Sequence, residues 1–110
     1  MAWQIFGKSK CFDTKKAERY FKERRIKYQY IDIIKYGMSR GELKSVSNSI
    51  PVDKLADPKD QDYALFQHLA SDEAKMEKLY EIPEMIQTPI VRNGKRATVG
   101  FCPEIWSSWE

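Results

Sequence analysis

The sequence predicts one α/β domain, in which a four-stranded mixed sheet carries flanking helices and an all-helical insert. Three observations predict this class. Strand-like and helix-like apolar patterns alternate through the N-terminal region. An Asn93-Gly94 pair separates two short apolar segments near the C-terminus, as in a two-residue hairpin. Between these regions lies a helix-rich stretch that is punctuated by Pro51, Pro58 and Pro83.

Length, charge and cysteine content restrict the class of protein further. A chain of 110 residues supports one modest core, so we expect a single domain over residues 1–110. Its 19 basic and 16 acidic residues are interleaved, and the net charge of +3 does not indicate nucleic-acid binding. There is no apolar run near the roughly 20 residues of a membrane span and no secretory leader pattern. The low cysteine count leads us to expect a cytoplasmic protein, and the charge balance and the lack of a long apolar run lead us to expect no direct contact with nucleic acid or membrane.

The first half of the expected sheet is a strand–helix–strand unit. Residues 2–6 are mostly apolar, which predicts a buried strand. Residues 14–24 repeat apolar side chains at helical spacing. Residues 27–33 alternate tyrosine and isoleucine with polar side chains, which predicts the second strand. Since a helix joins the two strands, we expect them to be parallel.

The middle of the chain predicts an all-helical insert over approximately residues 47–86. A helix over residues 39–46 precedes it, and the Ser-Arg-Gly-Glu start of this helix is a capping box. Within the insert, apolar residues at helical spacing predict helices over residues 62–70 and 71–80. The second of these begins Ser-Asp-Glu, a favourable N-terminal sequence for a helix.

The C-terminal part predicts a hairpin and a last helix. Residues 88–93 and 95–100 flank the Asn-Gly pair, which suits a type I′ turn because both central positions need a positive φ. The last helix begins near Pro103, a favourable first-turn residue. This order of elements is that of a thioredoxin-type fold, although the order alone leaves other α/β folds open. Cys11, at the exit of the first strand, favours the thioredoxin type.

Cys11 is the candidate nucleophile. A free cysteine has a pKa of about 8.5, and only its thiolate attacks disulfides. Unpaired N–H groups at the start of a helix stabilise an anion there. Lysines nearby act in the same direction, whereas Asp13 opposes them; the lysines are Lys8, Lys10, Lys15 and Lys16. The sequence thus predicts a lowered pKa for Cys11, and the alternative is that Cys11 is a small inert residue at a chain bend.

Five segments together resemble the ArsC-like family, which comprises glutaredoxin-coupled arsenate reductases and Spx-type transcriptional regulators. They occur in the order and spacing of that family, and the likeness is weakest over residues 46–79. The segments are CFDTKKA (11–17), RIKYQYIDI (25–33), SRGEL (39–43), TPIVRNG (88–94) and VGFCPEIW (99–106).

This resemblance implies a thioredoxin fold with a helical insert, and it implies that Cys11 stands at the reactive-cysteine position of the family. Pro89 then resembles the cis-proline that faces the active cysteine in thioredoxin folds, where the neighbouring backbone pairs with an extended thiol-bearing peptide. The alternative is an ordinary trans proline at the start of a strand.

The chain departs from the arsenate reductases at the positions that would bind the oxyanion. In that class an arginine precedes the proline of the third strand and another precedes the last helix, and here these positions are Thr88 and Cys102. Residues 48–87 contain no arginine either. Arg92 and Arg96 flank the hairpin turn, where we expect exposed charge. We therefore expect that the protein does not reduce arsenate.

Neither cysteine has a second cysteine close to it in the sequence, as a C-x-x-C redox switch requires. Spx-type regulators carry a C-x-x-C pair, and Thr14 replaces the second cysteine here. If the family geometry holds, Cys102 lies near the reacting centre, and our hypothesis is that it resolves the oxidised Cys11 as a distant second thiol. The alternative is that Cys102 packs under the last helix beside Trp106 as a small apolar residue.

Two functions remain. The first is a thiol-dependent oxidoreductase with no bound cofactor and no metal, in which Cys11 reacts with glutathione, glutaredoxin or a protein thiol partner, and glutathione serves as co-substrate. The second is an Spx-like regulator or adaptor that binds RNA polymerase without a redox switch. In the enzyme, Thr14 would hydrogen-bond the thiolate. Four further residues would bind the substrate: Lys8 and Lys10 by their charge, and Thr88 and Pro89 by their backbone.

Overall fold

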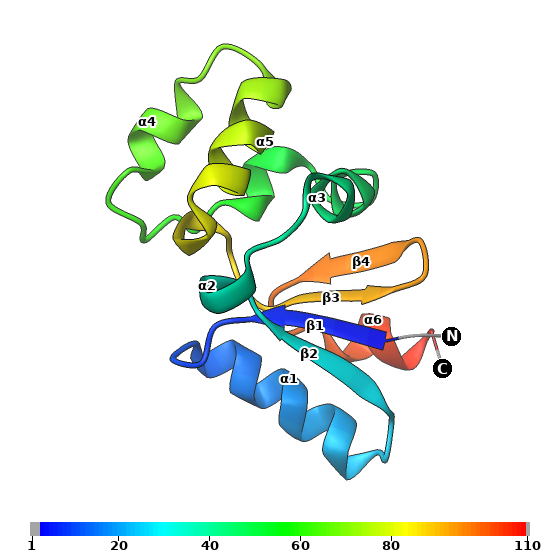
Figure 1. The fold of residues 1–110 in the computed structure, drawn as a ribbon. Coiled ribbons are helices and arrows are strands. Elements are labelled where there is room, and N and C mark those ends of the chain that lie inside the picture. The colour runs from blue at the N-terminus through cyan, green and yellow to red at the C-terminus, as the bar shows by residue number, and fades with distance from the viewer. Residues whose placement is uncertain (1–2, 110) are drawn as a thin grey trace.

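The computed structural model describes residues 3–109, and its four strands form one mixed sheet in the order β2-β1-β3-β4 (Figure 1). The strands β1 and β2 are parallel, and the hairpin of β3 and β4 adds an antiparallel pair beside β1. This confirms the predicted four-stranded mixed sheet and its thioredoxin-like order. Ala2, predicted to begin the first strand, lies outside the described residues. The strands are β1 (Trp3–Gly7), β2 (Tyr28–Asp32), β3 (Ile90–Asn93) and β4 (Arg96–Val99).

The helices follow the predicted order, with one addition. Each of the five predicted helices is present, and α4 is shorter than its pattern suggested. The short α2 was not predicted, and the Asp32 carboxylate caps it by accepting the backbone N–H groups of Ile34 and Lys35. The helices are α1 (Phe12–Glu23), α2 (Ile33–Tyr36), α3 (Arg40–Ser47), α4 (Tyr63–Gln67), α5 (Asp72–Glu81) and α6 (Pro103–Ser107), with 3₁₀ turns η1 (Val52–Leu55) and η2 (Pro83–Met85).

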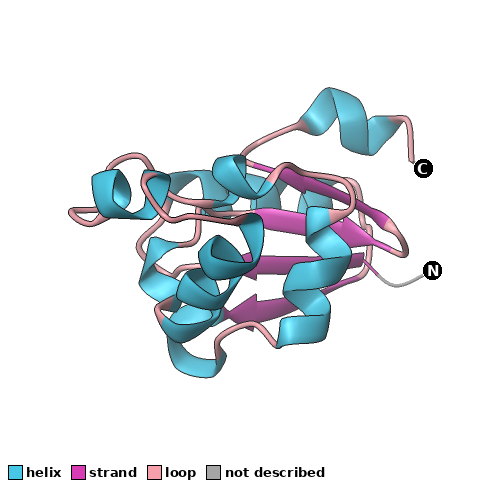
Figure 2. Cartoon of the chain, turned by 90° about the horizontal axis from the view of Figure 1, so that it is seen from above, coloured by secondary structure: helices cyan, strands magenta, loops and turns pink. Residues whose placement is uncertain are grey.

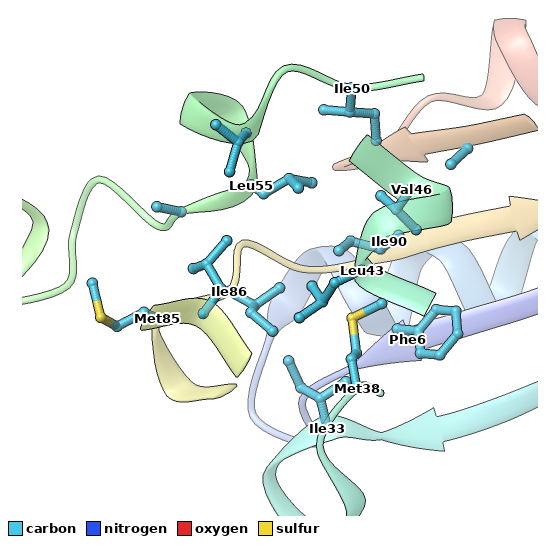
Figure 3. Packing of buried hydrophobic residues seen from close by; sticks show 14 of the residues in the cluster. Phe6, Ile33, Met38, Leu43, Val46, Ile50, Leu55, Met85, Ile86 and Ile90 are labelled. Atoms are coloured by element: carbon cyan, nitrogen blue, oxygen red, sulfur yellow. The ribbon is translucent and has the colours of Figure 1, made fainter. Parts of the chain in front are cut away.

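The sheet separates two groups of helices, as Figures 1 and 2 show. α1 and α6 cover one face, and their side chains form an aromatic cluster with the sheet around Phe21 and Trp106. α3 and the insert cover the other face. There the sheet residues Phe6 and Ile90 pack in one cluster with residues of α3 and the insert, among them Leu43, Val46, Leu55 and Ile86 (Figure 3). The insert therefore shares its core with the sheet.

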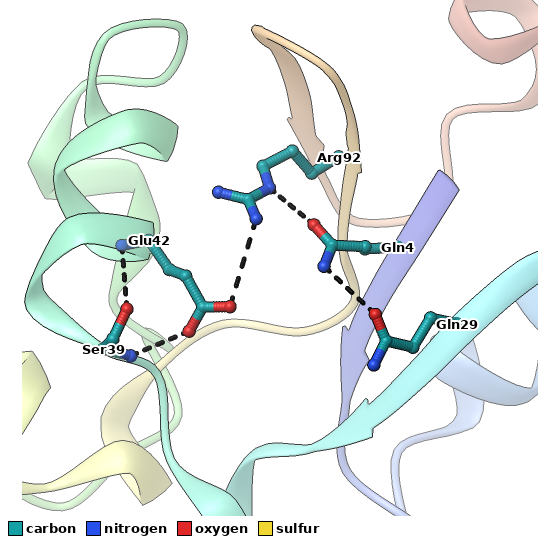
Figure 4. Close-up of polar contacts among 5 residues, drawn as sticks. All are labelled: Gln4, Gln29, Ser39, Glu42 and Arg92. Atoms are coloured by element: carbon teal, nitrogen blue, oxygen red, sulfur yellow. Dashed lines mark hydrogen bonds and ion pairs between the residues drawn. The ribbon is translucent and has the colours of Figure 1, made fainter. Parts of the chain in front are cut away.

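A polar chain also joins α3 to the sheet (Figure 4). The Arg92 guanidinium on β3 donates to the Gln4 side chain at 2.8 Å and lies 4.0 Å from the Glu42 carboxylate of α3. Glu42 also accepts the Ser39 backbone N–H, while the Ser39 hydroxyl accepts the Glu42 N–H, which confirms the capping box. The expectation of an exposed charge holds for Arg96 but is wrong for Arg92, whose side chain is 19% exposed.

Every helix within residues 3–109 is too short or too polar to serve as a membrane span.

Candidate active site

Cys11 lies at the N-cap position of α1, directly after the loop that leaves β1. Its backbone N–H donates to the Lys8 carbonyl at 3.0 Å, and its own carbonyl accepts the Lys15 N–H at 3.3 Å. These two bonds fix the turn before the helix and its first turn. The Cys11 thiol is half-buried and donates to the Thr88 carbonyl at 3.6 Å, although 77 residues separate the two in sequence. Folding thus brings the sulfur against the residue before Pro89.

Thr14, one helical turn after Cys11, is buried beside the sulfur. It is 1% exposed, and its hydroxyl oxygen has no hydrogen-bond partner among the residues that the structure describes. Gly7 at the end of β1 leaves the space for it: a Cβ at Gly7 would lie 2.3 Å from Thr14 Cγ2 and 2.9 Å from Thr14 Oγ1. A buried hydroxyl without a partner is unfavourable, and an adjacent thiolate would accept its hydrogen.

The surroundings of the sulfur favour its ionised form. Burial raises the pKa of Cys11, but the Thr14 hydroxyl lowers it, and so do hydrogen bonds from the Thr88 side chain and from the backbone N–H groups of Thr14 and Asp13. The net effect is a pKa below the ordinary value of the thiol. The backbone N–H groups and the Thr14 hydroxyl are donors that the sequence argument expected, the Thr88 side chain is a further donor, and the causes of the shift include no lysine.

An open pocket of about 590 Å³ lies in front of the sulfur. Two segments of the chain besides the Cys11 loop form its walls, one from the insert and one leading into β3. The insert segment supplies Lys59, which no local sequence pattern had marked, because it is a single exposed lysine in a loop. The charged residues on the walls are Lys8, Lys10, Asp13, Asp57 and Lys59.

Backbone pairing holds the insert wall in place. The Asp57 N–H donates to the Met85 carbonyl, and the Gln87 N–H donates to the Leu55 carbonyl, both at 2.7 Å. An antiparallel bridge between Ala56 and Ile86 lies between these bonds. The entry and exit of the insert are therefore joined directly before Thr88.

The Thr88-Pro89 peptide bond is cis, as predicted. Thr88 is 4% exposed, and the Pro89 carbonyl accepts the Gly100 N–H at 2.8 Å. The loop that follows β4 is thereby tied to the segment that contacts Cys11.

Cys102 lies at the N-cap position of α6. Its thiol donates to the Val99 carbonyl at 3.4 Å, and its side chain packs against the aromatic cluster that contains Trp106. Burial, followed by the charge of Glu104, raises the pKa of Cys102. These contacts favour the small apolar residue over the resolving thiol. Both cysteines are free, and the resolving role stays a prediction.

Most of the predicted site residues lie around one pocket. Lys8, Lys10 and Thr88 line it together with Cys11, and Thr14 lies behind the sulfur. The Lys8 ammonium also donates to the Glu84 carbonyl at 2.7 Å, which holds this side chain beside the insert. Cys102 is not among the described residues that line the pocket.

Comparisons with known proteins agree with this fold. A glutaredoxin family model matches residues 4–52. The chain is 27% identical over 107 residues to the global transcriptional regulator Spx 2 of Oceanobacillus iheyensis, a match that covers 92% of this chain and 78% of that protein.

Two solved structures share the fold over almost the entire chain. An ArsC-family-related protein from Bacteroides fragilis superposes with a TM-score of 0.88 at 22% identity and covers 100% of both chains. An arsenate reductase from Vibrio cholerae superposes with a TM-score of 0.85 at 24% identity, and the match covers 98% of this chain and 97% of that one. The sheet order and these likenesses show a thioredoxin-like fold, and the chain is similar to Spx 2 in sequence and to ArsC-family proteins in structure.

Proposed function

We propose that the protein is a thiol–disulfide oxidoreductase in which the Cys11 thiolate is the nucleophile and glutathione is the co-substrate. One observation carries the proposal: the Cys11 sulfur lies at the start of α1 beside the buried hydroxyl of Thr14, which has no hydrogen-bond partner among the described residues other than this sulfur. An inert cysteine gains nothing from such a donor, whereas a thiolate accepts its hydrogen bond.

The chemistry is thiol–disulfide exchange. The Cys11 thiolate attacks one sulfur of a disulfide, forms a mixed disulfide with it, and displaces the other sulfur as a thiolate that takes a proton from water. A glutathione thiolate then attacks the Cys11 sulfur of the mixed disulfide, which releases the substrate thiol and leaves a disulfide between Cys11 and glutathione. A second glutathione frees Cys11, so that one substrate disulfide is reduced as two glutathione molecules become oxidised glutathione.

The charges around the pocket support glutathione as this reductant. Glutathione carries two carboxylates and one ammonium group at neutral pH. Three lysines of the pocket can bind the carboxylates, namely Lys8, Lys10 and Lys59. Asp13 and Asp57 can bind the ammonium group. Lys8 and Lys10 lie in the same loop as the sulfur. Glutaredoxin or another protein thiol is the alternative reductant.

Arsenate is a poor fit to the same pocket. An arsenate site uses the planar fork of arginine to bind oxyanion oxygens, and the described residues that line this pocket include no arginine. Thr88 and Cys102 stand where the resemblance to arsenate reductases places arginines. Asp13 and Asp57 add negative charge near the sulfur. We propose that the substrate is a disulfide and that arsenate is not reduced.

The pH dependence of alkylation at Cys11, assigned by mass spectrometry, tests the proposal. We expect the apparent pKa of Cys11 to lie clearly below about 8.5 and to rise in Thr14→Val, which keeps the shape of the side chain but removes its hydroxyl. Cys11→Ser should abolish reduction of a glutathione mixed disulfide, with Cys102→Ser as the matched control. An ordinary pKa in the parent, or full activity in Cys11→Ser, would contradict the proposal.

A second candidate function is an Spx-like regulator or adaptor that binds RNA polymerase. It is favoured by the 27% identity to a global transcriptional regulator. Such a protein would bind through its surface, so that Cys11→Ser should be retained on purified RNA polymerase as strongly as the parent. Equal capture of both proteins, together with an ordinary pKa for Cys11, would favour this function over the enzyme.

A further inference from the structure

Two exposed phenylalanines and a lysine form a surface beside Cys11 that the proposed exchange reaction does not use. Phe12 follows Cys11 and is 71% exposed, and Phe101, 39% exposed, precedes Cys102. Lys16 lies between them: its ammonium is 5.1 Å from the centre of the Phe12 ring and 5.8 Å from that of Phe101. We call these three residues the aromatic–lysine surface.

The backbone holds this surface in a fixed relation to the sulfur. Cys11 contacts the Thr88 carbonyl, and the next carbonyl, that of Pro89, accepts the Gly100 N–H. Gly100 has a φ of +87°, a conformation that favours glycine, and this turn presents Phe101.

Buried contacts also order the Phe101 ring. It packs edge-on against Trp106, with ring centres 5.6 Å apart. Trp106 is fully buried and donates its indole N–H to the Thr98 hydroxyl at 2.8 Å. The Phe101 ring therefore packs on a buried and hydrogen-bonded side chain, so that little conformational entropy would be lost when a partner covers the ring.

Phe12 also lines the edge of the pocket beside Cys11, whereas Lys16 and Phe101 differ in character and position from the charged wall of the pocket. Lys59 and Asp57 come from the insert, on one side of the sheet, whereas Lys16 and Phe101 come from α1 and the β4–α6 loop, the elements of the other side (Figure 1). No carboxylate of the described residues pairs with Lys16. The ordered Phe101 ring, the exposed Phe12 ring and the unpaired Lys16 ammonium suit a partner that brings both apolar area and negative charge.

We propose that the aromatic–lysine surface binds a protein substrate through an extended segment in which an apolar residue and a carboxylate flank the reacting cysteine. This inference rests on the proposed function, since Cys11 must attack the cysteine sulfur of that segment. The Cys11 thiolate forms a disulfide with the segment, the former partner sulfur leaves as a thiolate and is protonated, and two glutathione thiols then reduce the mixed disulfide. The charged wall of the pocket, with Lys8, Lys10 and Lys59, remains for glutathione.

The test measures exchange rates with short peptides whose cysteine is disulfide-linked to 5-thio-2-nitrobenzoate, so that attack at the peptide sulfur releases the coloured thiolate. Leucine and glutamate flank the cysteine in one peptide, serine and glutamate in a second, and leucine and lysine in a third. The mixed disulfide of glutathione with the same chromophore is the reference. We expect the leucine–glutamate peptide to react about tenfold faster, relative to the reference, than either of the others, equivalent to about 1.4 kcal/mol.

Variants assign that preference to the surface. Phe101→Ala should lower the ratio of the leucine–glutamate peptide to the reference by about fivefold, and Lys16→Glu should make the leucine–lysine peptide the faster one. The matched controls are Tyr36→Ala, a ring that is also 71% exposed but lies on α2, and Lys22→Gln, at the far end of α1; both should keep the parental ratio.

Three results would overturn the inference, and they differ from a failure of the proposed function. Equal rate ratios for all three peptides, or ratios that Phe101→Ala and Lys16→Glu leave unchanged, would show that the aromatic–lysine surface does not select substrates, although Cys11 still reacts with disulfides. A parent that dimerises in sedimentation, with Phe101→Ala monomeric, would assign the surface to a second copy of the chain. Absence of reaction with every disulfide, the reference included, would instead refute the proposed function.

Discussion

At the scale of single residues, the site depends on a pair that the sequence separates by seven positions. Gly7 ends β1 without a side chain, and Thr14 fills that space from α1. The threonine stands where a C-x-x-C switch would have its second cysteine, so a hydroxyl donor occupies the place of a resolving thiol. Such a donor stabilises the thiolate of Cys11 but cannot form a disulfide with it.

Gly7→Ala should disturb this pair. The added Cβ would lie 2.3 Å from Thr14 Cγ2 and 3.1 Å from Tyr30 Cε1, so we expect the free energy of unfolding to fall by about 2 kcal/mol and the pKa of Cys11 to rise as Thr14 is displaced. Urea unfolding and pH-dependent alkylation measure the two effects.

The control for this prediction is another glycine with space around it. A Cβ at Gly41 would find its nearest neighbour, the Ser39 hydroxyl, at 4.0 Å, so Gly41→Ala should stabilise the helix by about 0.5 kcal/mol. Thr14→Ala should recover most of the stability lost in Gly7→Ala. A Gly7→Ala protein as stable as the parent would show that the close approach does not restrict this position.

At the scale of elements, α3 connects the sheet to the insert and is held at its start by the capping box of Ser39 and Glu42. We expect Ser39→Ala to lower the free energy of unfolding by about 1 kcal/mol, because the Glu42 N–H loses its acceptor. Ser108→Ala, whose exposed hydroxyl bonds only locally to the Ile105 carbonyl, is the control and should change stability by less than about 0.5 kcal/mol. Equal effects in chemical denaturation would contradict a specific role for the cap.

Most elements could be predicted because local pattern and tertiary packing agree. The capping box, the Asn-Gly turn and the cis Pro89 needed only a few adjacent residues or the family resemblance. The helix α2 could not be predicted, because Ile33 and Ile34 read as a continuation of the β-branched strand and only the Asp32 cap ends it.

The site was predictable in part for the same reason. Cys11 and Thr14 share one turn of helix, so their proximity follows from the sequence. Lys59 comes to the pocket from the insert through backbone pairing far along the chain, and Arg92 becomes half-buried because α3 folds over β3. Long-range placements of this kind leave no periodic signal in the sequence.

At the scale of the whole molecule, the insert and the sheet share one hydrophobic cluster, so we expect them to unfold together. Leu79 on α5 is fully buried in that cluster, and Leu79→Ala should lower the free energy of unfolding by about 3 kcal/mol. The fluorescence of Trp3, Trp106 and Trp109 reports on the opposite face of the sheet, because these residues lie in the cluster there. Tryptophan fluorescence and far-ultraviolet circular dichroism should show the same shifted midpoint; an earlier loss of helix signal would reveal an insert that unfolds alone.

Stability of the reduced protein should also depend on the ionisation of Cys11. Its pKa is lowered in the native state, so below about 8.5 the unfolded chain holds a proton that the native thiolate has released, and stability rises with pH. This contribution is lost as pH falls through the native pKa. Cys102, with its raised pKa, acts in the opposite direction, and only above about 8.5. Urea titrations should show that the free energy of unfolding of the parent rises between neutral pH and about 8.5, and that this rise is absent in Cys11→Ser. Equal slopes in the two proteins would contradict the prediction.

The backbone clasp formed by residues 55–57 and 85–87 limits the effect that sequence changes in the insert have on the site. It closes the insert into a loop whose two ends meet, so the chain between them can change in length or composition while the strand that carries Thr88 keeps its course. The Cys11 sulfur and the insert wall of its pocket therefore lie on segments that the clasp separates. Exposed positions within residues 58–84 can therefore change while Cys11 keeps its place at the start of α1.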